Sequence, residues 1–205
     1  MKKTFNYYLV IFIIILLLAS TLLLEEDIGS RIVTIITVGT ALIGAVALFI
    51  QYKRDKNISQ ATFILEYAKY FYSLNGVEDT MTKLDKYRLG NKDIVKDLND
   101  NGVINYLFWC EELSTLFQEG IIDFKTIDNL FSYNFFLITN NKYIQETELI
   151  PQAEFYKGIY YLHQEWTKYK KQTNQRVINP NESLDKVEIY STYAKKGDNY
   201  YKKTY

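Results

Sequence analysis

Two apolar runs separated by an acidic break constrain this chain more than any other feature of its sequence. The runs cover residues 7–24 and 32–50, and neither contains a charged residue. At 1.5 Å of rise per residue, a helix through either run would be roughly 27–29 Å long, about the hydrocarbon thickness of a bilayer. The sequence therefore predicts two membrane-spanning helices, at residues 7–24 and 32–50.

The break between the runs predicts the turn of a membrane hairpin. It contains Glu25, Glu26 and Asp27, and Gly29 can supply the turn. Each carboxylate would cost ~2.5–3.5 kcal/mol in the bilayer centre, which excludes a single continuous span. A secretory signal peptide is the alternative, but its apolar core would be shorter, about 7–15 residues. We therefore expect the first span to be retained.

The charges that flank the two spans predict their orientation. Lys2 and Lys3 precede the first span, and Lys53, Arg54 and Lys56 follow the second. Because positive flanks remain in the cytoplasm, both termini and everything after residue 50 should be cytoplasmic. Richness in Lys, Asn, Ile and Tyr is typical of an A+T-rich bacterial genome, so we expect a multi-pass protein of the bacterial inner membrane.

Small residues at helical spacing define a candidate helix-packing face in the second span. Such a face allows close helix contact in lipid, either with the first span of the same hairpin, which we favour, or between subunits. Its members are Thr37, Thr40, Ala41, Gly44 and Ala45.

Residues 51–171 predict an all-α cytoplasmic domain, a bundle of four or five helices, because strand signals are weak and apolar residues recur at helical spacing. Residues 172–205 predict a flexible tail containing Lys and Tyr, with a short ordered stretch at 184–193. The expected helices are an extension of the second span to residue 75, then 77–89, 93–98, 103–120, 126–147 and a last one from Pro151.

Apolar stripes predict which helix faces are buried. The central helix, 103–120, is apolar nearly all round. The predicted stripes are Ile58, Ala61, Leu65, Ala68 and Tyr72 in the first helix, Val103, Tyr106, Cys110, Leu113 and Phe117 in the central one, and Phe155, Ile159, Leu162, Trp166 and Tyr169 in the last.

No residue pattern in the sequence indicates a catalytic site, a cofactor or a metal centre. One histidine and one cysteine cannot make the usual zinc sets, and no phosphate-binding loop is present. We expect Cys110 to be an inert buried thiol and His163 a hydrogen-bonded structural residue. With 24 basic and 24 acidic residues, the charge balance gives no reason to expect a nucleic-acid partner.

The aromatic content, with 19 Tyr, 12 Phe and 2 Trp, allows two interpretations. Most of these rings should lie in the core and at the membrane interface. The alternative is a groove or surface for a partner. The candidate interaction surface consists of Glu111, Glu112, Tyr156, Tyr160 and His163.

One stretch resembles a known pattern. Residues 104–131 read INYLFWCEELSTLFQEGIIDFKTIDNLF, which is similar to a helix found in uncharacterised bacterial membrane-anchored proteins with an all-α cytoplasmic domain. The resemblance covers about residues 30–170 and implies an architecture but no catalytic residues; the double span and the tyrosine-rich tail depart from the pattern. The matching positions are Tyr106, Leu107, Glu111, Leu113, Gly120, Ile122 and Asp123.

Three functions are therefore open. The leading one is a membrane-anchored interaction or sensing protein without catalytic activity, whose partners are the lipid bilayer and a protein or a second copy. The second is a two-span membrane-disrupting effector of a bacterial phage-defence system. The third is a nuclease or other enzyme in the helical domain, with Glu111, Glu112 and Asp123 as its carboxylates.

Overall fold

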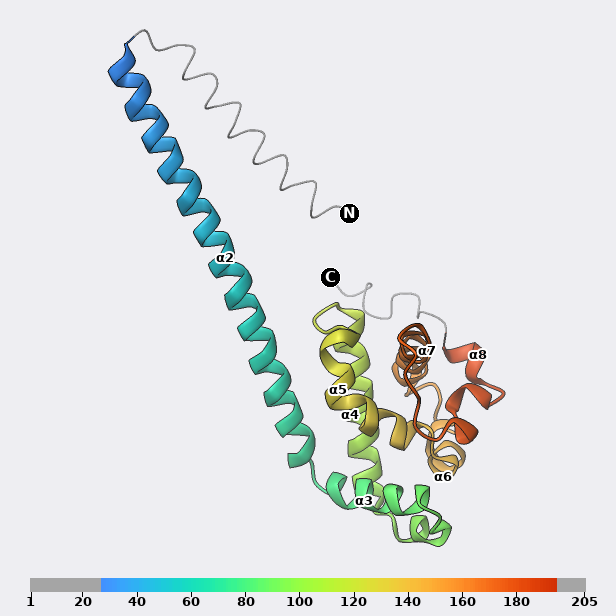
Figure 1. Cartoon of the computed structure of the whole chain (residues 1–205). Coiled ribbons are helices and arrows are strands. Elements are labelled where there is room, and N and C mark those ends of the chain that lie inside the picture. The colour runs from blue at the N-terminus through green and yellow to red at the C-terminus, as the bar shows by residue number, and fades with distance from the viewer. Residues whose placement is uncertain (1–26, 195–205) are drawn as a thin grey trace. The chain divides into compact units, whose positions relative to one another are not determined.

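The computed structural model describes residues 27–194, and it is helical with no strand in that part of the chain (Figure 1). The chain divides into two compact units, residues 1–59 and 60–205, each described here by itself. The elements are α2 (Ile28–Ser73), α3 (Val77–Arg88), η1 (Lys92–Asp97), α4 (Asp100–Gln118), α5 (Phe124–Thr139), α6 (Lys142–Ile144), the π-helical turn η2 (Gln145–Leu149), α7 (Lys157–Gln172), η3 (Pro180–Glu182), η4 (Leu184–Lys186) and α8 (Tyr190–Tyr193).

Helix α2 contains the predicted second span and continues, as predicted, to the end of the first expected domain helix. At its start, the Asp27 carboxylate accepts the backbone N–H of Ser30 at 3.3 Å, so this part of the acidic break caps the helix. At its end, Gly76 adopts a left-handed φ of 79°. The predicted first span, 7–24, lies outside the described residues, so the hairpin stays a prediction.

The domain end of α2 is buried along a different stripe from the predicted one. Ile64 and Phe71 are buried, whereas Leu65 and Tyr72 are 57% and 52% exposed, so the predicted stripe is wrong by one position. The buried stripe packs against the central helix: the Phe71 ring lies 4.4 Å from the ring of Trp109, and this purely apolar ring, rather than the hydroxyl-bearing Tyr72, takes the interior position.

Helix α4 is central, as its apolar surface predicted. Tyr106, Trp109, Cys110 and Leu113 are fully buried. The helix is capped by the side chain of Asn99, which accepts the N–H groups of residues 101 and 102. This helix therefore supplies the middle of the core.

The chain from residue 124 to 172 departs from the prediction. A single helix over 126–147 is wrong, because α5 ends at Thr139 and the next residues, Asn140 and Asn141, break it. Asn141 starts α6, with its side chain accepting the N–H of Ile144 at 3.2 Å. The last long helix begins at Lys157 rather than at the expected proline, and Phe155 is 76% exposed.

The segment 177–194, which we call the C-terminal strap, packs on the domain. It contains η3, η4 and α8, and its Leu184 and Ala194 side chains are fully buried. The prediction of a flexible tail is therefore wrong for this segment, while an ordered stretch was expected at 184–193. The rest of the predicted tail, 195–205, lies outside the described residues.

Candidate functional site: a buried polar network that holds the strap

Asn140, the residue that follows α5, is the centre of a buried polar network. Its side-chain Nδ2 donates to the carbonyl of Ile178 at 2.7 Å, and its Oδ1 accepts the N–H of Leu184 at 3.0 Å. The same Oδ1 lies 2.9 Å from Nε2 of His163 on α7. One fully buried amide therefore joins α5, α7 and two backbone groups of the strap.

The partners of Asn140 determine the tautomer of His163. A backbone carbonyl only accepts, so the Asn140 amide nitrogen faces Ile178 and its oxygen faces the imidazole. His163 must then donate from Nε2 and accept at Nδ1, where the hydroxyl of Tyr190 lies at 2.9 Å. Burial lowers the pKa of His163 to about 4, opposed only in part by the charge of Asp185. His163 is thus a neutral, hydrogen-bonded structural histidine, as predicted.

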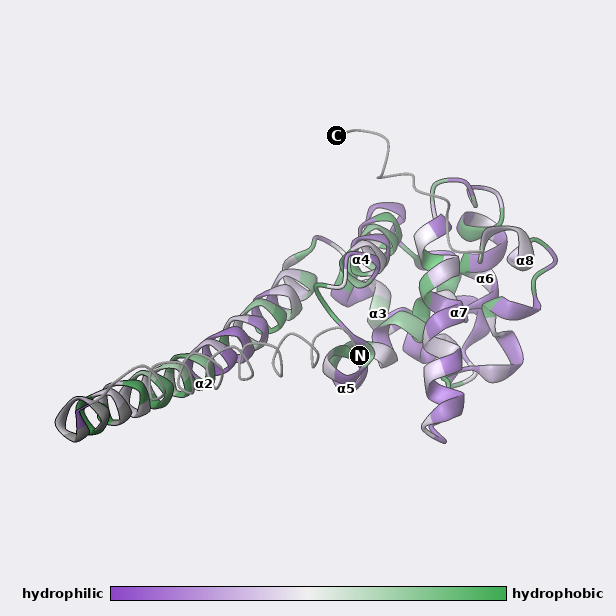
Figure 2. Ribbon diagram, turned by 90° about the horizontal axis from the view of Figure 1, so that it is seen from above, coloured by the Kyte–Doolittle hydropathy of each residue, from purple (hydrophilic) through white to green (hydrophobic). Residues whose placement is uncertain are grey.

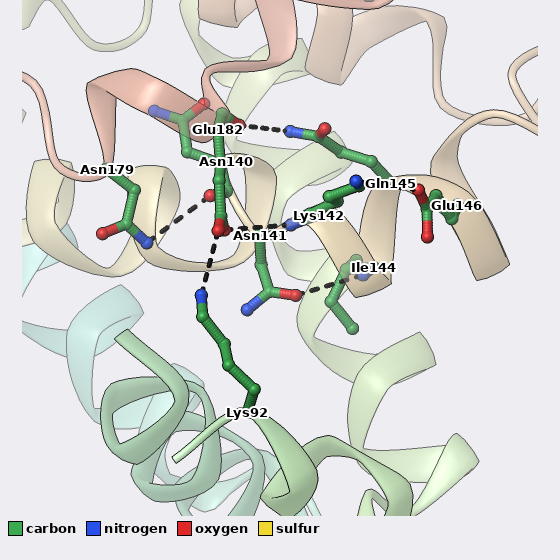
Figure 3. A network of polar contacts seen from close by, with 9 residues as sticks. All are labelled: Lys92, Asn140, Asn141, Lys142, Ile144, Gln145, Glu146, Asn179 and Glu182. Atoms are coloured by element: carbon green, nitrogen blue, oxygen red, sulfur yellow. Dashed lines mark hydrogen bonds and ion pairs between the residues drawn. The ribbon is translucent and has the colours of Figure 1, made fainter. Parts of the chain in front are cut away.

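A second group of contacts, drawn in Figure 3, extends the network to the surface. The side-chain nitrogen of Gln145 donates to the carbonyl of Glu182 at 2.8 Å (Figure 3). It also donates to the carbonyl of Thr139 at 2.8 Å. The Glu182 carboxylate pairs with the ammonium of Lys92 at 2.9 Å and accepts the N–H of Lys142 at 3.4 Å. Gln145 therefore binds the main chain of the strap, while Lys92 and Lys142 bind the side chain of Glu182.

A groove of about 280 Å³ lies beside this network, between the α6–η2 region and the strap. Its walls carry charges of both signs, and one acidic residue among them, Glu182, is already paired with Lys92. The lining residues include Gln145, Ile150, Glu182, Ser183 and Lys186. The arrangement holds a peptide segment, the strap. His163 in the adjoining network is neutral and both of its ring nitrogens are hydrogen-bonded, so it is not free to exchange protons with a substrate.

The predicted interaction surface is not a surface in the structure. Tyr156, Tyr160 and His163 are buried, and the Tyr160 hydroxyl donates to the carbonyl of Leu149 at 2.9 Å, so the prediction is wrong for these side chains. Tyr160 and His163 lie on the face of α7 that packs against η2 and the strap, and this packing buries them. Of the two predicted acidic members, Glu112 is exposed.

Glu111 caps α7 from the neighbouring helix. Its two carboxylate oxygens accept the N–H groups of Gly158 and Ile159, each at 2.9 Å. A Cβ at position 158 would lie 2.7 Å from the Glu111 carboxyl carbon, so a larger residue there would displace the carboxylate that caps α7. Burial raises the pKa of Glu111 against the two hydrogen bonds that lower it.

The other residues considered for chemistry, Asp123 and Cys110, also have structural roles. Asp123 caps α5 by accepting the N–H of Thr126 at 2.9 Å. Cys110 is fully buried, and burial raises the pKa of its thiol well above the ordinary value, as expected for an inert cysteine. Within residues 27–194, no group of three or more His, Cys, Asp or Glu side chains could hold a metal ion. These contacts give the nuclease hypothesis no support.

The candidate helix-packing face lies on the exposed part of α2. The hydroxyls of Thr37 and Thr40 donate to backbone carbonyls one turn earlier, at 2.9 and 2.8 Å, so both are satisfied within the helix. A Cβ at Gly44 would meet nothing within 4 Å, and Ala41 and Ala45 are exposed. This face is therefore available for packing against another helix.

The sequence pointed to His163 but not to the residues that surround it. Asn140, Gln145, Glu182 and Tyr190 were missed, because each is polar and lies outside the apolar stripes. Two consecutive asparagines at 140 and 141 were the one local signal, since such residues favour helix ends.

Searches against family models, curated proteins and solved structures found no match to this chain. The resemblance to bacterial membrane-anchored proteins therefore stays a prediction. The structure itself defines an all-helical protein in its described part, with one helix, α2, that is long and apolar enough to cross a membrane.

Proposed function

We propose that this chain is a membrane-anchored protein of the bacterial inner membrane that acts by binding a protein partner rather than by catalysis. In this proposal the spans at 7–24 and 32–50 form a hairpin with both termini in the cytoplasm. The helical domain is then the part that meets the partner.

The observation that carries the proposal is the set of exposed apolar side chains of α2, whose ribbon is green at many of its residues in Figure 2. Ile36, Ile43 and Leu48 are 63%, 74% and 68% exposed, and most of the side chains around them are also exposed. In water each such side chain would lose about 1.5–3 kcal/mol of burial free energy, whereas lipid removes that cost.

The charges at the two ends of this stretch support the orientation. Lys53, Arg54 and Lys56 are exposed directly after it, while Asp27 lies at the opposite end of the helix. Basic residues on the cytoplasmic side and an acidic turn outside agree with the positive-inside rule.

Paired lysine substitutions test the anchor. We expect Ile36→Lys/Ile43→Lys to keep the second span out of the bilayer, because each lysine costs ~2.5–3.5 kcal/mol in the bilayer centre. The first span would still anchor the chain, but the residues after it would then lie on the external side. The matched control is Ile58→Lys/Leu65→Lys, which changes exposed apolar residues of the same helix after the basic cluster.

Flotation of membranes on a density gradient, after a carbonate wash, measures whether the full chain is anchored. Reporter fusions after residues 24, 56 and 205 report the topology, with an external signal expected only for the first in the unchanged chain. In Ile36→Lys/Ile43→Lys the reporter at residue 205 should become external, while the control pair leaves it cytoplasmic. Failure of the unchanged chain to float, an external reporter at its residue 205, or the same reporter signal for both lysine pairs would overturn the proposed anchor.

The small-residue face of α2 favours a second candidate, a membrane-disrupting effector of a bacterial phage-defence system that clusters through this face. We expect Gly44→Leu to reduce both cross-linked oligomers and toxicity on induction, because the larger side chain blocks close helix contact. Gly39→Leu is the matched control, since Gly39 is on the opposite side of the helix and a Cβ there also meets nothing within 4 Å. Equal effects of the two substitutions would exclude clustering through the small face.

A further inference from the structure

The strap is bound in the way that proteins bind a separate peptide. Three of its main-chain groups, the carbonyls of Ile178 and Glu182 and the N–H of Leu184, are hydrogen-bonded by side chains of Asn140 and Gln145. The Leu184 side chain is fully buried. Main-chain hydrogen bonds combined with an apolar anchor are the common form of peptide recognition. We call the surface that holds the strap the strap groove.

The link between α7 and the strap, residues 173–176, is exposed, and its hydrogen bonds are local ones to the last turn of α7. Asn174 in this link adopts a left-handed φ of 54°. A non-glycine residue in this region costs a little free energy, although asparagine tolerates it best. A change of backbone direction here would leave the strap and its groove intact as two complementary parts.

We propose that the strap of one copy occupies the strap groove of a second copy, so that the chain forms strap-exchanged dimers. Every bond of the strap would be remade between the two copies, which makes such an exchange a low-cost route to association. The proposal rests on the membrane anchor proposed above in one respect. Anchoring confines the copies to a surface and raises their effective concentration, which increases binding between chains.

Two complementary full-length variants test the exchange. Leu184→Asp destroys the strap but leaves its groove, whereas Asn140→Ala destroys the groove but leaves the strap. A mixture of the two contains one intact strap and one intact groove, on different chains. We expect differently tagged copies of the two variants, co-expressed and extracted in mild detergent, to be captured together at least tenfold more than either variant with itself.

The controls are Leu89→Asp and Asn129→Ala, which change exposed residues of the same types outside the strap and its groove. Capture of the mixed pair at the level of either variant alone would overturn the exchange. Equal capture of all pairs would show association through the membrane helices instead. Because capture is measured in detergent and the anchor by flotation, failure of one proposal is distinguishable from failure of the other.

A shorter link provides a second test in case either substitution unfolds the domain. Deleting residues 174–176 shortens the reach of the strap by roughly 10 Å, which should disfavour binding to its own groove. We expect the mass of this full-length variant in detergent, measured by light scattering, to shift from monomer to dimer. A variant that stays monomeric, with the strap exposed to proteolysis, would overturn the proposal.

Discussion

At the scale of single residues, His163 shows how one side chain can make the fold depend on pH. Its Nε2 donates to Asn140 and its Nδ1 accepts from Tyr190, so neither nitrogen is available for a second proton. Asp185 is the acidic group that raises the pKa of His163, but burial outweighs it and leaves the pKa at about 4, below the ordinary 6.5. The folded state therefore favours the neutral imidazole.

This depressed pKa predicts a loss of stability in mild acid. The contribution is fully present above pH 6.5, where the unfolded chain is also neutral, and is lost as the pH falls toward 4. By pH 5 the free energy of unfolding should be lower by about 2 kcal/mol than at pH 7.5. Denaturant unfolding of the full chain in detergent micelles measures it. His163→Gln removes the only histidine of the chain and serves as the control. Equal pH dependence in both proteins would contradict the assignment.

At the scale of elements, helix existence was predictable from sequence, whereas helix ends and buried faces were only partly so. Periodicity located α3 and α4, because their apolar residues are set by local spacing. The end of α5 was missed, because the side chain of Asn140 is satisfied by the backbone of the strap, which lies 38 and 44 residues later in the chain. Local patterns contain no information about such distant partners.

Long-range contacts of this kind also join the long helices of the domain. The buried Asp128 on α5 accepts hydrogen bonds from Trp166 and Lys170 on α7, at 2.7 and 2.9 Å. An aspartate in an apolar helix predicts little by itself. The burial of Asp128 is compensated by its ion pair with Lys170 and its hydrogen bond from Trp166, residues that belong to another helix. Of the candidate site, the sequence therefore indicated the structural role of His163 but not the strap that it holds.

At the scale of the whole molecule, the hydrophobic core begins well after the apolar stretch of α2. Within the described chain, the first residue of the core is Ile64, followed by Phe71. The side chains that the structure describes in residues 27–59 are mostly exposed, and none of them is a core residue. The described core residues therefore all lie in residues 60–205, the second of the two units.

This division predicts two different outcomes for two truncations. A chain of residues 60–205 should be soluble without detergent and unfold cooperatively, because it keeps the whole core. A chain of residues 77–205 loses the buried side chains of Ile64 and Phe71. Loss of a buried Phe alone costs about 3–5 kcal/mol, a large part of the 5–15 kcal/mol typical of a domain. Circular dichroism melting curves should therefore show a cooperative transition for the longer chain and a much lower midpoint, or none, for the shorter one. Equal midpoints would mean that the last turns of α2 do not stabilise the domain.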